Sequence, residues 1–228
     1  MTTWGSEGAG PTSWGQERLE AAVRDHTEST PAKGILQHFQ HFIQLYELMG
    51  PHLVRNKPTY LINGQHYAYD RALLHKQEVM YRTGQVSKRA LMFGSYCGHT
   101  LLILLASNPA LKIVCVDTAP YAPAIVNYLN QHFQNRIMLF VGNHKDALSL
   151  FADNVFDLVH LDTDATVPLV FHHFQDIQRV AIQGAFIAVD GYEQIRSLID
   201  TWIENKILNK TMVSPPLWTS IVTNLCKK

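Results

Sequence analysis

The chain has few cysteines, no excess of either charge and no long apolar run. Its three cysteines, Cys97, Cys115 and Cys226, show no Cys-x-x-Cys spacing, so the sequence indicates neither a zinc knuckle nor a disulfide framework. A formal net charge of zero argues against the basic surface that nucleic-acid binding uses, so we expect no nucleic-acid partner. No apolar run approaches the ~20 residues of a membrane-spanning helix, and no secretory signal is recognisable, so we expect no membrane partner and a cytoplasmic location.

Hydrophobic residues make up 46% of the chain, enough for a sizeable core. Residues 1–30 are rich in glycine, serine and threonine without periodicity, which predicts a flexible N-terminal arm. Residues 31–84 predict a helical cap on the substrate side, and the amphipathic stretch from Ile35 to Met49 is also a candidate homodimer contact. The aromatic loop at residues 60–69 is either a lid over a ligand or a cover for the core.

From residue 85 to residue 228, short apolar runs alternate with amphipathic stretches, which is typical of a parallel sheet covered on both faces. The predicted fold class is α/β: a Rossmann-like, doubly wound sheet, mostly parallel with an antiparallel C-terminal strand, preceded by the helical cap. The expected strands are residues 90–93, 112–116, 137–141, 156–161, 185–189, 211–213 and 219–224. The expected helices of this domain are residues 100–107, 120–133, 147–151, 167–181 and 195–207.

A glycine turn follows the first expected strand. Gly94 ends the apolar run, Gly98 follows it, and Asp117 closes the next apolar run, which together form the pattern of a nucleotide-binding βαβ unit. Because two carboxylate oxygens can accept from two ribose hydroxyls, Asp117 is a candidate ribose ligand; the alternative is an ordinary cap of the next helix. The spacing is Gly-x-x-x-Gly rather than Gly-x-Gly-x-x-Gly, which argues against NAD, and no P-loop is present.

Polar or glycine-rich segments follow the expected parallel strands, at the sheet edge where ligands bind in open α/β folds. Gly94-Ser-Tyr-Cys-Gly-His-Thr resembles the first motif of class I S-adenosylmethionine-dependent methyltransferases, in the form of the catechol O-methyltransferase-like group. Gly142-Asn-His-Lys-Asp resembles the adenine-side loop of that group. Asp157-Leu-Val-His-Leu-Asp-Thr-Asp and Gly184-Ala-Phe-Ile-Ala-Val-Asp also resemble the macrocin-type sugar O-methyltransferases. The likeness spans about residues 90–192.

The resemblance implies methyl transfer from S-adenosylmethionine to a hydroxyl oxygen of a small-molecule acceptor, with or without the help of a divalent metal. It also implies which residues contact the cofactor. These are Gly94, Tyr96, Gly98 and Thr100 on the methionine side, Asp117 at the ribose, Thr118, Gly142, His144 and Lys145 around the adenine, and Asp162.

A catalytic and metal site is implied as well. Asp162 and Asp190 match the positions of two carboxylate ligands, and Mg²⁺ suits such hard oxygen ligands. Asp162 and Asp164 are the implied catalytic residues, with Asp164 as a further ligand or base. The alternative for Asp162 and Asp190 is a pair of strand-end caps that hold no metal. His160 is close in sequence, but strand alternation predicts that it points into the sheet core.

The chain departs from the group's pattern at positions that matter for chemistry. Met92 stands where the group usually has an acid, Gly191 offers no side-chain oxygen as a third metal ligand, and Ala165 cannot take a proton. These departures keep a second hypothesis open, a methyltransferase-like binding or scaffold protein with a degenerate catalytic site. An RNA or protein methyltransferase is a third hypothesis, against which the zero net charge argues.

Overall fold

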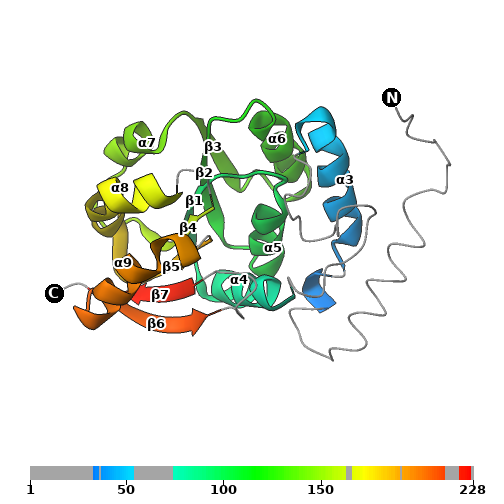
Figure 1. Cartoon of the computed structure of the whole chain (residues 1–228). Coiled ribbons are helices and arrows are strands. Elements are labelled where there is room, and N and C mark those ends of the chain that lie inside the picture. The colour runs from blue at the N-terminus through cyan, green and yellow to red at the C-terminus, as the bar shows by residue number, and fades with distance from the viewer. Residues whose placement is uncertain are drawn as a thin grey trace, which may run out of the picture.

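A seven-stranded sheet in the order β3-β2-β1-β4-β5-β7-β6 forms the centre of the molecule (Figure 1). The computed structural model describes residues 33–35, 37–53, 74–162, 166–190, 192–213 and 221–226. Strands β1 to β5 pair in parallel, and β7 runs antiparallel to β5 and β6, so the fold class expected from the sequence is confirmed. The strands are β1 Arg89–Phe93, β2 Lys112–Asp117, β3 Ile137–Val141, β4 Phe156–Leu161, β5 Ala181–Val189, β6 Leu208–Val213 and β7 Ile221–Leu225.

Helices cover both faces of the sheet, as expected for a parallel sheet made of apolar strands (Figure 1). One face carries α3 (Phe39–Met49), α4 (Leu74–Val86), α5 (His99–Ser107) and α6 (Ala122–His132), and a 3₁₀ turn, η1 (Gly50–His52), follows α3. The other face carries α7 (His144–Leu150), α8 (Thr166–Val180) and α9 (Tyr192–Glu204). Among the helices that the structure describes, none has the length and apolar character that crossing a membrane requires.

Strand alternation divides the core into two layers. Ala90 and Met92 of β1 pack with α3 to α6, whereas Leu91 and Phe93 pack with α7 to α9. All four side chains are buried, because a strand in the middle of the sheet has a helix layer on each side. The same alternation in β4 and β5 decides which strand-end side chains can meet.

Several element boundaries differ from the prediction, and two of these differences have a local cause in the structure. Helix α7 begins at His144 rather than at residue 147, because the Asn143 side chain accepts from the Asp146 N–H (2.9 Å) and caps an earlier turn. Strand β5 begins at Ala181 rather than at residue 185, and its register against β4 shifts between Ala181 and Phe186, where Gly184 has φ +78°. A bulge of this kind interrupts the apolar pattern from which strands are predicted.

Helix α3 packs onto the domain that follows it. Phe42 and Leu45 are fully buried in the same core layer as Met92, so the apolar face of α3 is covered within the chain and does not need a second copy to bury it. The division of the chain at residues 30 and 84 stays a prediction. The arm at residues 1–30 and the aromatic loop at residues 60–69 lie outside the described residues.

Candidate active site

The turn after β1 is tightly constrained. Gly94 has φ +86° and its N–H donates to the carbonyl oxygen of Val116 (2.9 Å), while Gly98 has φ +75° at the start of α5. A Cβ on Gly98 would lie 2.5 Å from Cγ2 of Ile125, so this position combines a left-handed backbone with a lack of space. Gly94 and Tyr96 are partly exposed at this edge of the sheet, whereas Gly98 and Thr100 are buried beneath the turn.

Asp117 links the ends of β1 and β2. Its Oδ2 accepts from the backbone N–H (2.7 Å) and the hydroxyl (2.5 Å) of Ser95, and its Oδ1 accepts from the N–H of Ala119 (2.9 Å). A carboxylate has about four acceptor positions, so these bonds leave room for a ribose hydroxyl. Asp117 therefore caps the segment before α6 and keeps capacity for a ligand. Nothing in the sequence pattern singled out Ser95 as its partner.

The loop after β3 is hydrogen-bonded to the end of β2. The N–H of Gly142 donates to the carbonyl oxygen of Asp117 (3.1 Å), so the loop with His144 and Lys145 lies beside the Asp117 end of β2. His144 is partly buried, with its ring 5.0 Å from the ring of His173 in α8, and burial together with His173 lowers the pKa of His144. It is therefore neutral at physiological pH. Lys145 and Thr118 are exposed.

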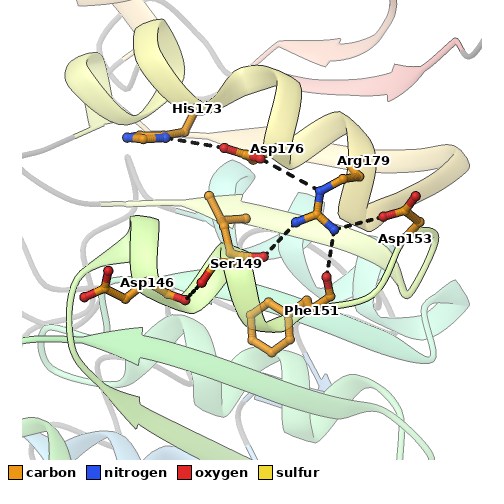
Figure 2. A network of polar contacts seen from close by, with 8 residues as sticks. Asp146, Ser149, Phe151, Asp153, His173, Asp176 and Arg179 are labelled. Atoms are coloured by element: carbon orange, nitrogen blue, oxygen red, sulfur yellow. Dashed lines mark hydrogen bonds and ion pairs between the residues drawn. The ribbon is translucent and has the colours of Figure 1, made fainter.

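A polar network fixes α7, and with it His144, against α8 (Figure 2). Arg179 of α8 donates to the carbonyl oxygens of Phe151 (2.7 Å) and Leu148 (2.8 Å) at the end of α7. It also donates to Asp153 (2.9 Å), and its Nε lies 3.8 Å from Asp176. Because the last carbonyls of a helix have no partner within the helix, this guanidinium satisfies groups that α7 itself leaves open.

The carboxylates after β4 and β5 lie together. The N–H of Asp162 donates to the carbonyl oxygen of Phe93 (3.1 Å), and the N–H of Asp190 donates to that of Leu161 (2.9 Å), so neighbouring strands align the two residues. His160, Asp162 and Asp190 each bring a ligand atom to a group that lies within 4.8 Å. Asp164, Ala165 and Gly191 lie outside the described residues.

His160 belongs to this cluster, although the sequence argument separated it. It is buried, as predicted, with 1% of its surface exposed. However, residues two apart on a strand share a face, so His160 lies on the same side of β4 as Asp162. Burial lowers the pKa of His160 to about 4, with a smaller opposing effect from Asp190. Among the described residues neither ring nitrogen has a hydrogen-bond partner, and Nε2 lies 3.8 Å from Oδ2 of Asp190.

Lys76 of α4 donates from its ammonium to Oδ2 of Asp190. The two side chains are only 15% and 12% exposed. Sequence reasoning missed Lys76, because it lies in the segment without a family motif and is 114 positions from Asp190. Two carboxylates and an imidazole resemble a metal-ligand set, but an ammonium already neutralises one of these carboxylates. The arrangement therefore does not fit Mg²⁺ as it stands.

Comparison with known proteins agrees with this architecture. Residues 91–192 match the model of a methyltransferase domain. No curated protein sequence matches the chain. Among solved structures, the O-methyltransferase TomG from Streptomyces achromogenes, involved in tomaymycin synthesis and solved with S-adenosylmethionine, is 14% identical, with 95% of this chain and 100% of that chain covered and a TM-score of 0.61.

Two further structures share the fold. The O-methyltransferase from Bacillus cereus, in complex with S-adenosylhomocysteine, is 13% identical over 84% of this chain and 91% of that chain, with a TM-score of 0.59. A methyltransferase from Geobacter sulfurreducens is 11% identical over 92% and 96%, with a TM-score of 0.56. The resemblance to methyltransferases that the sequence motifs carry is confirmed by the domain match at residues 91–192. The fold of the chain is the fold of these solved methyltransferases.

Proposed function

We propose that the protein transfers the methyl group of S-adenosylmethionine to a hydroxyl oxygen of a small molecule. The observation that carries this proposal is the Asp117 carboxylate, hydrogen-bonded to Ser95 in the glycine turn and adjacent to the His144 loop. That arrangement places a carboxylate that can accept hydrogen bonds from ribose hydroxyls beside the partly buried ring of His144, at neighbouring strand ends. The switch point between β1 and β4, where the strand order reverses, is also where open α/β sheets bind ligands.

Each part of the site has a separate task in this proposal. The cofactor supplies a methyl group that is activated on a sulfonium. The Gly94 turn would hold the methionine end, Asp117 the ribose hydroxyls, and His144 with exposed Lys145 and Thr118 the adenine. Gly98 and Thr100 shape the turn from below.

The acceptor hydroxyl would be oriented by Asp162 and Asp190. As the new carbon–oxygen bond forms and the carbon–sulfur bond breaks, the hydroxyl proton passes to the Asp162 carboxylate. A positioned base contributes ~10²–10⁴-fold to such a step, and alignment of the two reactants contributes more. Asp164 stays a proposal for a second base. The proposed mechanism does not use the Mg²⁺ site that the resemblance implied, because the Lys76 ammonium contacts the Asp190 carboxylate.

Calorimetry with S-adenosylhomocysteine tests the cofactor half. We expect saturable binding to the unmodified protein and a loss of at least ~10-fold in affinity for Asp117→Asn, which keeps the shape of the side chain but gives up its charge. Asp200→Asn, a substitution of a half-exposed carboxylate on α9, serves as the matched control. Absence of binding at millimolar ligand would contradict the proposal.

Labelled methyl transfer to a panel of hydroxylated acceptors tests the catalytic half. Turnover that falls by ~10²-fold or more in Asp162→Asn supports an O-methyltransferase that uses this carboxylate. Binding of S-adenosylhomocysteine without transfer to any acceptor would instead favour the binding or scaffold hypothesis, and transfer to RNA or protein alone would favour the third hypothesis.

A homodimer stays a prediction, and a measurement of the molecular mass in solution tests it.

A further inference from the structure

The carboxylate pair at the ends of β4 and β5 needs a compensating cation. Asp162 and Asp190 have ligand atoms within 4.8 Å of each other, and two like charges at that range repel strongly in a partly buried site. The Asp190 carboxylate is only 12% exposed, so water screens it poorly. The fold supplies the missing charge from α4, through the Lys76 ammonium on Oδ2 of Asp190.

The position of Lys76 follows from the faces of the sheet. Residues 160 and 162 of the β4 segment share one face, and Asp190 shares it with Ala188, which pairs with His160. Ala188 packs in the same core layer as Val79 and Met80 of α4. Helix α4 therefore covers the face on which the carboxylates project, and its Lys76 side chain contacts Asp190.

We propose that Lys76 takes the place of a divalent cation at the Asp162–Asp190 pair, so that the site works without a metal. This inference rests on the proposed function, because it takes Asp162 and Asp190 as part of a methyl-transfer site. It adds to that function how the charges of the two carboxylates are balanced. Among the residues that the structure describes in this cluster, two carboxylates and one ammonium leave one net negative charge, which complements a singly positive sulfonium. Adding a divalent ion beside Lys76 would make the cluster positive and repel the cofactor instead.

His160 makes the inference testable. Its buried imidazole has no hydrogen-bond partner among the described residues and lies in the same cluster as the carboxylates. Without the ammonium, His160, Asp162 and Asp190 would offer one nitrogen and two carboxylate ligands, a set that suits Mn²⁺ better than Mg²⁺. Lys76→Met, which keeps the length of the side chain and removes its charge, should therefore create a metal site that the unmodified protein lacks.

The experiment measures Mn²⁺ binding by electron paramagnetic resonance, without cofactor or acceptor. We expect no site-specific binding to the unmodified protein at about millimolar Mn²⁺, and binding at least ~10-fold tighter for Lys76→Met. Lys76→Arg should exclude the metal, and Lys76→Met combined with Asp162→Asn should lose it again. Circular dichroism shows whether each variant is folded, and His160→Gln in the Lys76→Met background checks the nitrogen ligand.

Two results would overturn the inference. One is Mn²⁺ binding to the unmodified protein that Asp162→Asn abolishes, because Lys76 would then leave room for a metal. The other is a folded Lys76→Met variant that gains no affinity, because Lys76 would then not hold the position of the cation. Since the measurement needs no cofactor, a failure here is distinguishable from a failure of S-adenosylhomocysteine binding, which would remove the proposed function alone.

Discussion

At the scale of single residues, the site depends on backbone conformations that few side chains allow. Gly98 has φ +75° and its missing Cβ leaves space for Ile125, so the turn and α6 approach each other closely. Tyr96, in the same turn, has φ +38°, a left-handed conformation in a residue that is not glycine. Such conformations cost energy and persist where the surrounding contacts hold them. The backbone of this turn therefore restricts which residues can stand at these two positions.

Gly98→Ala should destabilise the protein because it adds both backbone strain and a clash with Ile125. Gly184→Ala is the matched control, since Gly184 has a similar φ of +78° with nothing within 4 Å of an added Cβ. We expect about 1–2 kcal/mol of lost unfolding free energy for Gly184→Ala and about 1–3 kcal/mol more for Gly98→Ala. Urea denaturation followed by circular dichroism measures both. Equal losses would show that the contact with Ile125 has no energetic consequence.

At the scale of elements, helix α7 is too short to be stable by itself and depends on its neighbour. Its seven residues begin at an Asn143 cap and end on carbonyls that Arg179 of α8 satisfies. Isolated helices of this length are not stable in water, so the contacts with α8 hold α7 in place. Because His144 is the first residue of α7, the network in Figure 2 positions from a distance the residue that we propose for the adenine side.

Arg179→Met should therefore loosen α7 and weaken S-adenosylhomocysteine binding together. We expect a loss of about 1–3 kcal/mol in unfolding free energy, because the carbonyls of Leu148 and Phe151 lose their charged donor. Arg196→Met is the control: Arg196 is 60% exposed, and its pair with Asp200 spans 3.7 Å. An exposed pair of this kind contributes less than about 0.5 kcal/mol. Thermal denaturation measures the stability of both variants, and calorimetry measures their affinity for S-adenosylhomocysteine. Equal effects of the two substitutions would contradict the role of Arg179 in holding α7.

At the scale of the whole molecule, α3 and the sheet share one layer of the core. His99 at the start of α5 donates from Nε2 to the carbonyl oxygen of Phe42 in α3 (3.0 Å) and is buried. Burial lowers the pKa of His99 to about 4. The neutral imidazole thus belongs to the contact that docks α3 beside the cofactor turn.

Stability should fall as the solution becomes acidic. The unfolded chain takes up a proton on His99 near its ordinary pKa of 6.5, whereas the folded chain does so only near 4. The stabilisation is therefore complete above about pH 6.5 and is lost as the pH falls towards 4, by on the order of 3 kcal/mol for this group. Urea denaturation between pH 7.5 and 5 measures the slope. His99→Gln should flatten the slope without removing it, because other buried histidines also titrate; an unchanged slope would exclude His99 as a contributor.

The sheet and the cofactor turn were predictable from the sequence because their signals are local. Apolar runs such as residues 156–161 bury both faces, and Gly94, Gly98 and Asp117 mark the boundaries of elements at fixed spacing, so the strands and the resemblance follow from short segments. The misplaced start of β5 has a local cause too, since the register shift near Gly184 hides its first residues from the pattern.

The contact between Lys76 and Asp190 was decided only by the tertiary structure. Helix α4 spans Leu74–Val86, but the rotation of that helix against the sheet depends on how Val79 and Met80 pack in a core built from distant segments. That packing brings Lys76 to Asp190 across 114 positions. The sequence by itself determined the fold and the resemblance to methyltransferases, because local patterns carry them. Packing decided the charge of the site, because charge depends on which side chains meet.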